Sequence, residues 1–223
     1  MAAALTLPEL VIFDCDGVLV DSEPIANRAL AAAITRLGHP MSVTQTRSAF
    51  VGLSMSQIMK DISVLTGQAL LDDWRQQLQE ETYAAFRQSL RAVPGVDKAV
   101  ARIKAEKIAV CVASSGSCDK MELTLGLTGL RSYFGENLFS STMVARGKPH
   151  PDLFLHAAAR MGVLPAQSVV IEDSGPGVAG ARAAGMRVFA YAGDAESKAA
   201  ELTAKGGEIF TDMAMLPGLL GLD

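Results

Sequence analysis

The sequence predicts an α/β protein whose core is a parallel β-sheet between layers of helices. Short apolar runs without alternation recur along the chain, as expected of strands that are buried on both faces. The segments between these runs repeat apolar residues at helical spacing, and in one of them Phe154, Ala158 and Met161 share a face. Alternation of such strands with helices is typical of a parallel sheet.

We expect five strands in this sheet. Gly185 lies between an alanine-rich segment and the last of them, as a helix-ending glycine would. The elements together predict a Rossmann-like three-layer core. The expected strands are Leu10–Phe13, Ile108–Ala113, Leu138–Ser141, Val169–Ile171 and Val188–Tyr191.

The stretch from about Pro24 to Leu90 interrupts this alternation, because it contains no convincing strand. Pro94-Gly95 then marks the return to the α/β pattern. Apolar residues recur at helical spacing through the stretch, which predicts a small helical bundle. The repeating residues are Leu30, Ile34 and Leu37, then Ile58, Ile62 and Leu65, then Leu71, Trp74 and Leu78, then Tyr83, Phe86 and Leu90.

The bundle divides the chain into two predicted domains. Residues 1–22 and 92–223 form the α/β core, and residues 23–91 form an α-helical cap inserted after the first strand. Ligands of open α/β sheets bind outside the carboxyl ends of the strands. A module inserted there would therefore cover the site and act as a lid.

Composition and charge exclude several classes of protein. The 223 residues carry a net charge of -4, which offers no basic face to a nucleic acid. Three cysteines without a C-x-x-C pair suggest neither a disulfide framework nor a zinc site. Residues 1–14 contain no basic residue, unlike a secretory signal, and no apolar run approaches the ~20 residues of a membrane span. We expect a soluble cytoplasmic protein, by default a monomer, without nucleic-acid or membrane partners.

The strongest local signal is an apolar strand that runs directly into Asp14-Cys15-Asp16-Gly17. Carboxylates at a buried strand end are costly unless they are paired, hydrogen-bonded or bound to a metal. A polar turn would explain one aspartate and Gly17. It would not explain a second acid within an otherwise apolar run.

Three later segments place further polar residues after predicted strands or before a helix. Each has a plain structural interpretation of its own: a Ser-Gly loop, a surface lysine, and helix capping by Asp173 or Ser174. The segments are Ser114-Ser115-Gly116, Gly147-Lys148-Pro149 and Glu172-Asp173. Paired carboxylates offer hard oxygen ligands, which suit Mg²⁺ better than zinc.

The run Asp14 to Glu23, D-x-D-G-V-L-V-D-S-E, resembles the first motif of the haloacid dehalogenase superfamily. More narrowly, it is similar to the phosphatase and β-phosphoglucomutase-like branch, and the three later segments match the remaining motifs in order. The resemblance implies a Mg²⁺-dependent phosphatase that acts on a small phosphorylated metabolite through an aspartyl-phosphate. Such an enzyme places its nucleophile and metal at the strand ends.

The resemblance also implies roles for individual residues. Asp14 attacks phosphorus, and Asp16 protonates the leaving oxygen and then activates water. Ser114 and Lys148 complete the catalytic set. The expected phosphate-binding residues are Ser114, Ser115, Gly116 and Lys148, and the expected metal ligands are Asp14, Asp16, Glu172 and Asp173.

Three other functions remain as alternatives. Dehalogenases resemble this chain at Asp14 but lack the second aspartate and the metal. β-Phosphoglucomutases carry an arginine in a cap G-V-S-R segment, where this chain has Gly52-Leu53-Ser54-Met55, and a histidine near the position of Ala26. Methionine cannot hold a phosphate as a guanidinium does. A non-catalytic phospho-ligand sensor of the receiver type would lack both Asp16 and the helical insertion.

The substrate is the least determined property. The overall pattern resembles bacterial phosphatases of the sugar-phosphate, 6-phosphogluconate and phosphoglycolate type. We expect the specificity loop within Arg47 to Met59, with Arg47, Gly52 and Met55 as candidate residues. Arg47 would bind a substrate carboxylate or be a solvated helix arginine. For Met55, Met59 and Trp74, a place in the cap core is the favoured interpretation.

Overall fold

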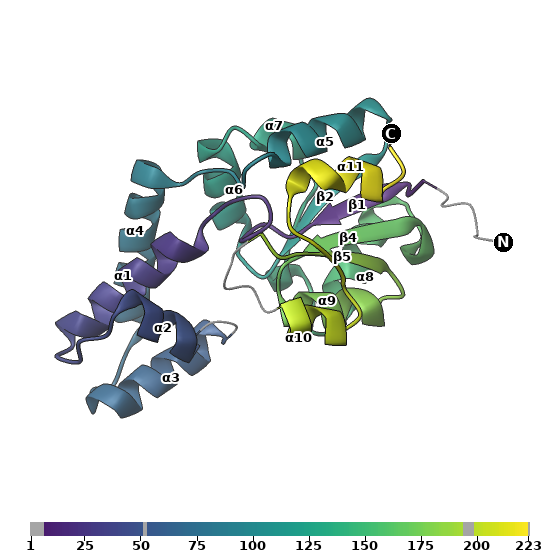
Figure 1. Ribbon diagram of the computed structural model, residues 1–223. Helices are drawn as coiled ribbons and strands as arrows, with labels where there is room; N and C mark the ends of the chain where they lie inside the picture. The colour runs from purple at the N-terminus through teal and green to yellow at the C-terminus, as the bar shows by residue number, and fades with distance from the viewer. Residues whose placement is uncertain (1–6, 51–52, 194–198, 223) are drawn as a thin grey trace. The chain divides into compact units, whose positions relative to one another are not determined.

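The computed structural model describes residues 7–50, 53–193 and 199–222, and the chain forms two compact units. One unit comprises Met1–Val20 with Ala92–Asp223, and the other comprises Asp21–Arg91. Figure 1 shows the elements of each unit, which are described separately below.

The first unit contains a six-stranded sheet in the order β3-β2-β1-β4-β5-β6, in which every pair of neighbours is parallel. Phe13 at the end of β1 lies opposite Val112 of β2 and Ile171 of β4, so these three strands end at one edge. The predicted α/β fold is confirmed. The strands are β1 (Leu10–Phe13), β2 (Ala109–Ser114), β3 (Leu138–Ser140), β4 (Ser168–Glu172), β5 (Arg187–Tyr191) and β6 (Glu208–Phe210).

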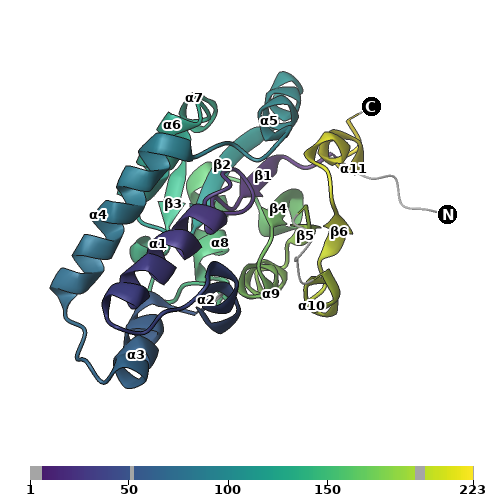
Figure 2. The ribbon, with the colours of Figure 1, turned by 60° about the vertical axis from the view of Figure 1, so that its left-hand side comes forward.

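Helices cover both faces of this sheet and make three layers (Figures 1 and 2). On one face, Leu10 and Ile12 join a core cluster with apolar residues of α8, α9 and α10. On the other, Phe13 meets Phe134 of α7 edge-on, with ring centroids 6.0 Å apart, and α5 packs against β2. The helices of this unit are α5 (Val96–Ala105), α6 (Cys118–Leu127), α7 (Arg131–Phe134), α8 (Asp152–Met161), α9 (Gly175–Ala183), α10 (Ala199–Ala204) and α11 (Leu216–Leu219), with 3₁₀ turns η1 (Ser141–Met143), η2 (Pro165–Gln167) and η3 (Met213–Met215).

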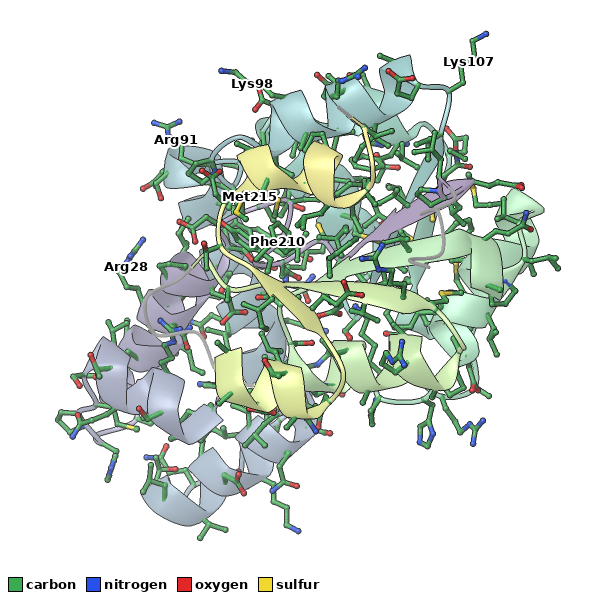
Figure 3. All side chains as sticks on the ribbon, turned by 45° about the vertical axis from the view of Figure 1, so that its right-hand side comes forward. Arg28, Arg91, Lys98, Lys107, Phe210 and Met215 are labelled. Atoms are coloured by element: carbon green, nitrogen blue, oxygen red, sulfur yellow. The ribbon has the colours of Figure 1, made fainter. Side chains whose placement is uncertain are left out.

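The edge strand β6 is absent from the sequence-based prediction. It has three residues, and the first two, Glu208 and Ile209, are exposed. Only Phe210, which is labelled in Figure 3, is buried. Its ring packs against the rings of Phe189 and Tyr191. A strand this short, with one buried residue, has no apolar run or alternation that a sequence pattern could reveal.

In the part of the second unit that the structure describes, helices joined by turns and loops are the only regular elements. Its core contains Leu30, Ile34, Ile58, Ile62 and Leu78, as their spacing predicts. Two residues of the predicted repeats, Leu65 and Leu71, are instead exposed, and Leu71 precedes its helix rather than lying within it. The helices are α1 (Glu23–Arg36), α2 (Val43–Phe50), α3 (Met55–Thr66) and α4 (Asp72–Ser89).

The three residues that we assigned to the core of this unit differ in burial. Trp74 packs partly buried against the core cluster, and Met59 is half-buried. Met55 is the first residue of α3 and is 40% exposed, so its assignment to the core is wrong. Among the helices that the structure describes in either unit, none is long and apolar enough to cross a membrane.

Candidate active site

The predicted nucleophile, Asp14, lies directly after the end of β1. Asp14 follows Phe13, and its backbone N–H donates to the Ile171 carbonyl of β4 at 2.9 Å. Its side chain is nearly buried, with the residue 7% exposed. Because β1, β2 and β4 are parallel and in register, Asp14, Ser114 and Glu172 are brought to the same edge of the sheet.

Lys148 reaches this edge from the loop that precedes α8. Its ammonium donates to Asp14 Oδ1 at 2.7 Å and to Glu172 Oε1 at 2.6 Å. The Lys148 side chain is 4% exposed and also lies over the ring of Phe154, 5.2 Å from the centroid. A lysine this deeply buried is held by charge pairing, which excludes the interpretation as a surface lysine.

Glu172 is fully buried, and hydrogen bonds hold both of its carboxylate oxygens. Oε1 accepts from Lys148, and Oε2 accepts from the backbone N–H groups of Asp173 and Ser174 and from Ser174 Oγ at 2.8–2.9 Å. Ser174 caps α9, since its Oγ also accepts from Gly177 N. A Cβ at Gly177 would lie 1.7 Å from Glu172 Oε1, so only glycine leaves room for this carboxylate.

Three of the four predicted metal ligands lie together. Carboxylate oxygens of Asp14, Glu172 and Asp173 all lie within 4.8 Å of one another. Asp16, the fourth, is not in this group among the described residues. Its Oδ2 accepts instead from the ammonium of Lys120 at 2.8 Å.

The charges of this cluster are unbalanced. Burial raises the pKa of Asp14 to about 7; Lys148 opposes the shift, while Glu172 and Asp16 add to it. For Lys148, burial acts to lower the pKa, but Asp14 and Glu172 together raise it above its ordinary value. One ammonium therefore faces two buried carboxylates, and added positive charge beside Asp14 would stabilise its ionised form.

The predicted phosphate loop follows β2 and is pinned by neighbouring side chains. Ser114 is 1% exposed, and its Oγ accepts from Gly116 N at 3.0 Å. Ser140 Oγ, at the end of β3, donates to the Gly116 carbonyl at 2.7 Å, and Ser141 Oγ, at the start of η1, donates to the Ser115 carbonyl at 2.9 Å. A Cβ at Gly116 would lie 3.8 Å from Asp16 Oδ2, so the loop and Asp16 are neighbours.

Lys120 is the residue of this site that sequence reasoning missed. It lies in the first turn of α6, and its backbone N–H donates to the N-cap Ser117 Oγ at 3.2 Å. A single lysine in an ordinary helix carries no sequence signal. Its position relative to Asp16 depends on how α6 packs against the segment that follows β1, which only the tertiary structure shows.

The candidate specificity residues belong to the helical unit. Arg47 lies in the last turn of α2 and is half-buried, and Met55 begins α3. Gly52 lies outside the described residues.

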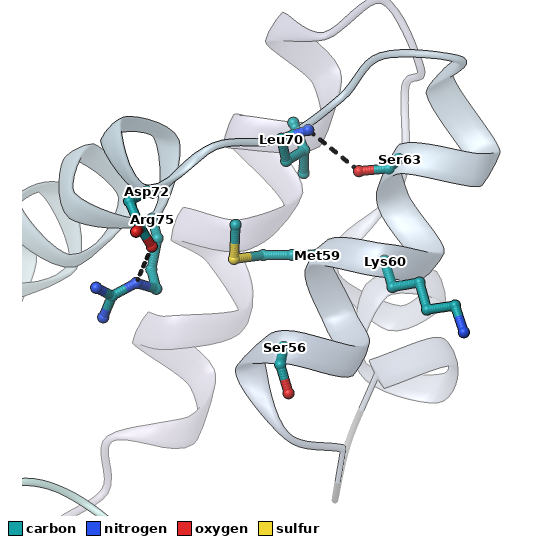
Figure 4. Close-up of a pocket in the computed structure, with 7 residues that line it drawn as sticks. All are labelled: Ser56, Met59, Lys60, Ser63, Leu70, Asp72 and Arg75. Atoms are coloured by element: carbon teal, nitrogen blue, oxygen red, sulfur yellow. Dashed lines mark hydrogen bonds and ion pairs between the residues drawn. The ribbon is translucent and has the colours of Figure 1, made fainter.

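The same unit contains a hollow of about 410 Å³ between α3 and the start of α4 (Figure 4). Arg75 at its rim pairs with Asp72 at 3.3 Å, and Leu70 N donates to Ser63 Oγ. Its lining includes neither Arg47 nor Met55, so it does not correspond to the predicted specificity site. The lining residues are Ser56, Met59, Lys60, Ser63, Leu70, Asp72 and Arg75.

Residues 8–185 match the family of haloacid dehalogenase-like hydrolases. The chain belongs to this family. The match spans Asp14, Ser114 and Glu172 at the strand ends and Lys148 in the loop that precedes α8. The superfamily predicted from the motifs is therefore confirmed.

Individual relatives of this haloacid dehalogenase-like hydrolase support the same family assignment. The 6-phosphogluconate phosphatase of Escherichia coli (strain K12) is 31% identical over 212 residues, covering 95% of this chain and 94% of the relative. A haloacid dehalogenase-like protein of unknown function from Agrobacterium tumefaciens str. C58 matches with a TM-score of 0.83 and 34% identity, covering 96% of this chain and 97% of that one. A family hydrolase from Deinococcus radiodurans R1, solved with bound phosphate and sodium, matches with a TM-score of 0.82 and 29% identity, covering 97% and 98%. The comparisons confirm the predicted enzyme class, a phosphoric monoester hydrolase.

Proposed function

We propose that this hydrolase is a Mg²⁺-dependent phosphatase that cleaves a sugar phosphate or a phosphorylated sugar acid through an aspartyl-phosphate on Asp14. The observation that carries the proposal is the contact of Lys148 Nζ with Asp14 Oδ1 at 2.7 Å, beside the carboxylates of Glu172 and Asp173. A carboxylate can attack an anionic phosphate only where fixed positive charge offsets their repulsion. Lys148 supplies part of that charge and fixes the direction of Asp14.

The chemistry proceeds in two displacements. An oxygen of Asp14 forms a bond to phosphorus while the bond from phosphorus to the leaving oxygen breaks, and Asp16 gives that oxygen its proton. Water then attacks phosphorus while the bond from phosphorus to the Asp14 oxygen breaks, and the water gives a proton to the Asp16 carboxylate. Inorganic phosphate leaves, and both aspartates return to their starting states.

The phosphoryl oxygens would be bound on the side of the β2 loop. Ser114 and Ser115 offer hydroxyl groups there, and Lys148 offers its ammonium. The Gly116 N–H, the other predicted donor, already donates to Ser114 Oγ. The hydrogen bonds from Ser140 and Ser141 fix the loop before a ligand arrives. Fixed donors need no reorganisation when the phosphoryl group binds.

The acidic cluster fits a divalent cation. Three carboxylates, Asp14, Glu172 and Asp173, share one ammonium, Lys148, so the four residues have a formal net charge of -2. Their donor atoms are oxygens, which suit Mg²⁺. We propose Asp14 and Asp173 as its carboxylate ligands, since hydrogen bonds already hold both oxygens of Glu172. When bound, Mg²⁺ would neutralise charge between the nucleophile and the phosphoryl oxygens.

The substrate class is proposed from the relatives. The Escherichia coli relative is named a 6-phosphogluconate phosphatase and matches nearly the whole chain. We propose residues 23–91 as the cap that selects the substrate, with Arg47 as the candidate residue for binding its carboxylate. Cytoplasmic location and a monomeric state remain predictions.

A metabolite panel tests the proposal. Phosphate release is measured from 6-phosphogluconate, glucose 6-phosphate, phosphoglycolate and p-nitrophenyl phosphate, with Mg²⁺ or with a chelator. We expect release with Mg²⁺ and its loss on chelation and in Asp14→Asn, while Asp97→Asn, at an exposed aspartate of α5, stays active. No release from any compound would overturn the phosphatase. Conversion of β-glucose 1-phosphate to the 6-phosphate would instead favour the mutase, which Met55 disfavours.

A further inference from the structure

Lys120 makes a specific contact with the second aspartate of the site. Its ammonium donates to Asp16 Oδ2 at 2.8 Å, and the side chains are 27% and 21% exposed. The two residues lie 104 positions apart in the chain, so the contact is made only in the folded protein. Lys148 contacts Asp14 and Glu172, whereas Lys120 contacts Asp16. The two proposed catalytic aspartates are therefore contacted by different lysines.

The stem of Lys120 is confined by the phosphate loop. A Cβ at Gly116 would lie 3.3 Å from Lys120 Cδ and 3.4 Å from Ser114 Oγ. The lysine stem therefore passes directly over Gly116 on its way to Asp16. This contact limits the conformations of a side chain that is otherwise among the most flexible.

The helix that carries Lys120 is also tied to the Asp14–Asp16 segment. Thr124, one turn further along α6 and fully buried, donates to the Lys120 carbonyl at 2.9 Å. Its Oγ1 lies 3.7 Å from Sγ of Cys15, the residue between the two aspartates. Lys120 and Asp16 thus lie on segments that pack against each other.

We propose that Lys120 is the positioning residue for Asp16. Its hydrogen bond fixes the direction of the Asp16 carboxyl group, so that the other oxygen meets the leaving group when the ester bond breaks. The inference rests on the phosphatase function proposed above. A misplacement of about 1 Å in such a group costs about 100-fold in rate, so loss of the anchor should slow the protonation step specifically.

The dependence on the leaving group tests this role. An alkoxide leaving group needs the proton of Asp16, whereas p-nitrophenolate, a weak base, leaves without it. In Lys120→Met, we expect kcat/KM for the best sugar phosphate to fall about 10-fold to 100-fold. For p-nitrophenyl phosphate we expect kcat/KM, which does not include the later hydrolysis of the aspartyl-phosphate, to change by less than about threefold. Lys120→Arg should restore part of the loss, and Lys98→Met, at an exposed lysine of α5 that points to solvent in Figure 3, should match the wild type.

A double variant separates positioning from direct contact with phosphate. If Lys120 acts through Asp16, adding Lys120→Met to Asp16→Asn should lower the sugar-phosphate rate no further. Equal losses for both substrates would instead make Lys120 a phosphate-binding residue and overturn the proposal. An unchanged rate, or additive losses in the double variant, would overturn it as well. If the wild-type protein released phosphate from neither substrate, the proposed phosphatase function itself would be refuted. That outcome is distinct from a failure of the role of Lys120.

Discussion

Gly17 and Asp173 are so close that a Cβ atom on Gly17 would lie 2.0 Å from Asp173 Oδ2. Gly17 has φ of +78°, a conformation that side chains disfavour. The glycine of the first motif therefore has two functions, since it turns the chain after Asp16 and leaves space for a carboxylate of the fourth motif. The two motifs are coupled by this contact.

Gly17→Ala should displace the Asp173 carboxylate and weaken Mg²⁺ binding about 10-fold or more. Gly162→Ala is the matched control, because Gly162 has φ of +71° and no atom within 4 Å of a Cβ. Both variants should lose about 1–2 kcal/mol for the backbone conformation. Titration of activity with Mg²⁺ separates them, and an equal Mg²⁺ requirement in the two variants would contradict the role of this space.

Gly177→Ala should displace Glu172 and thereby loosen Lys148, because the added carbon would overlap Glu172 Oε1. We expect a loss of about 2 kcal/mol or more in the free energy of unfolding, together with reduced turnover. Gly126→Ala in α6 is the control, since nothing lies within 4 Å of its Cβ. It should stabilise the protein by about 0.5–1 kcal/mol. Urea denaturation measures both, and a neutral Gly177→Ala would show that Glu172 can move freely.

Lys148→Met should remove the ammonium that Asp14 and Glu172 share. Breaking a buried ion pair leaves uncompensated charge and costs about 3–5 kcal/mol. Lys98→Met, at an exposed position, should change stability by less than about 0.5 kcal/mol. Denaturation in the presence of a chelator compares the two variants, and equal stabilities would mean that Lys148 does not compensate these carboxylates.

Burial raises the pKa of Asp14 to about 7. The stability of the metal-free protein should depend on pH because of this shift. A raised carboxyl pKa favours folding below the unfolded value near 4, and this contribution is lost as pH rises through about 7. With a chelator present, the wild-type melting temperature should therefore fall from pH 5 to pH 8 more than that of Asp14→Asn. Added Mg²⁺ should raise the wild-type melting temperature more at pH 8 than at pH 5. An identical Mg²⁺ effect at both pH values would contradict this linkage.

Much of this arrangement could be predicted from the sequence, because strand ends carry strong local signals. Apolar runs that stop at Asp14, Ser114 and Glu172 placed these residues at one edge of a parallel sheet, where the structure finds them. Lys120 could not be predicted in this way, since its contact with Asp16 depends on how two distant segments pack. The strand β6 lacked a pattern for a different reason, its single buried residue.

The covalent intermediate on Asp14 is the central claim, and acid quenching during turnover with Mg²⁺ tests it most directly. The quenched protein is digested, and the peptides are examined by mass spectrometry. We predict a phosphoryl group on the peptide that contains Asp14, at a level that follows turnover, and its absence in Asp14→Asn. A phosphoryl group on a different residue, or wild-type turnover by Asp14→Asn, would contradict the claim.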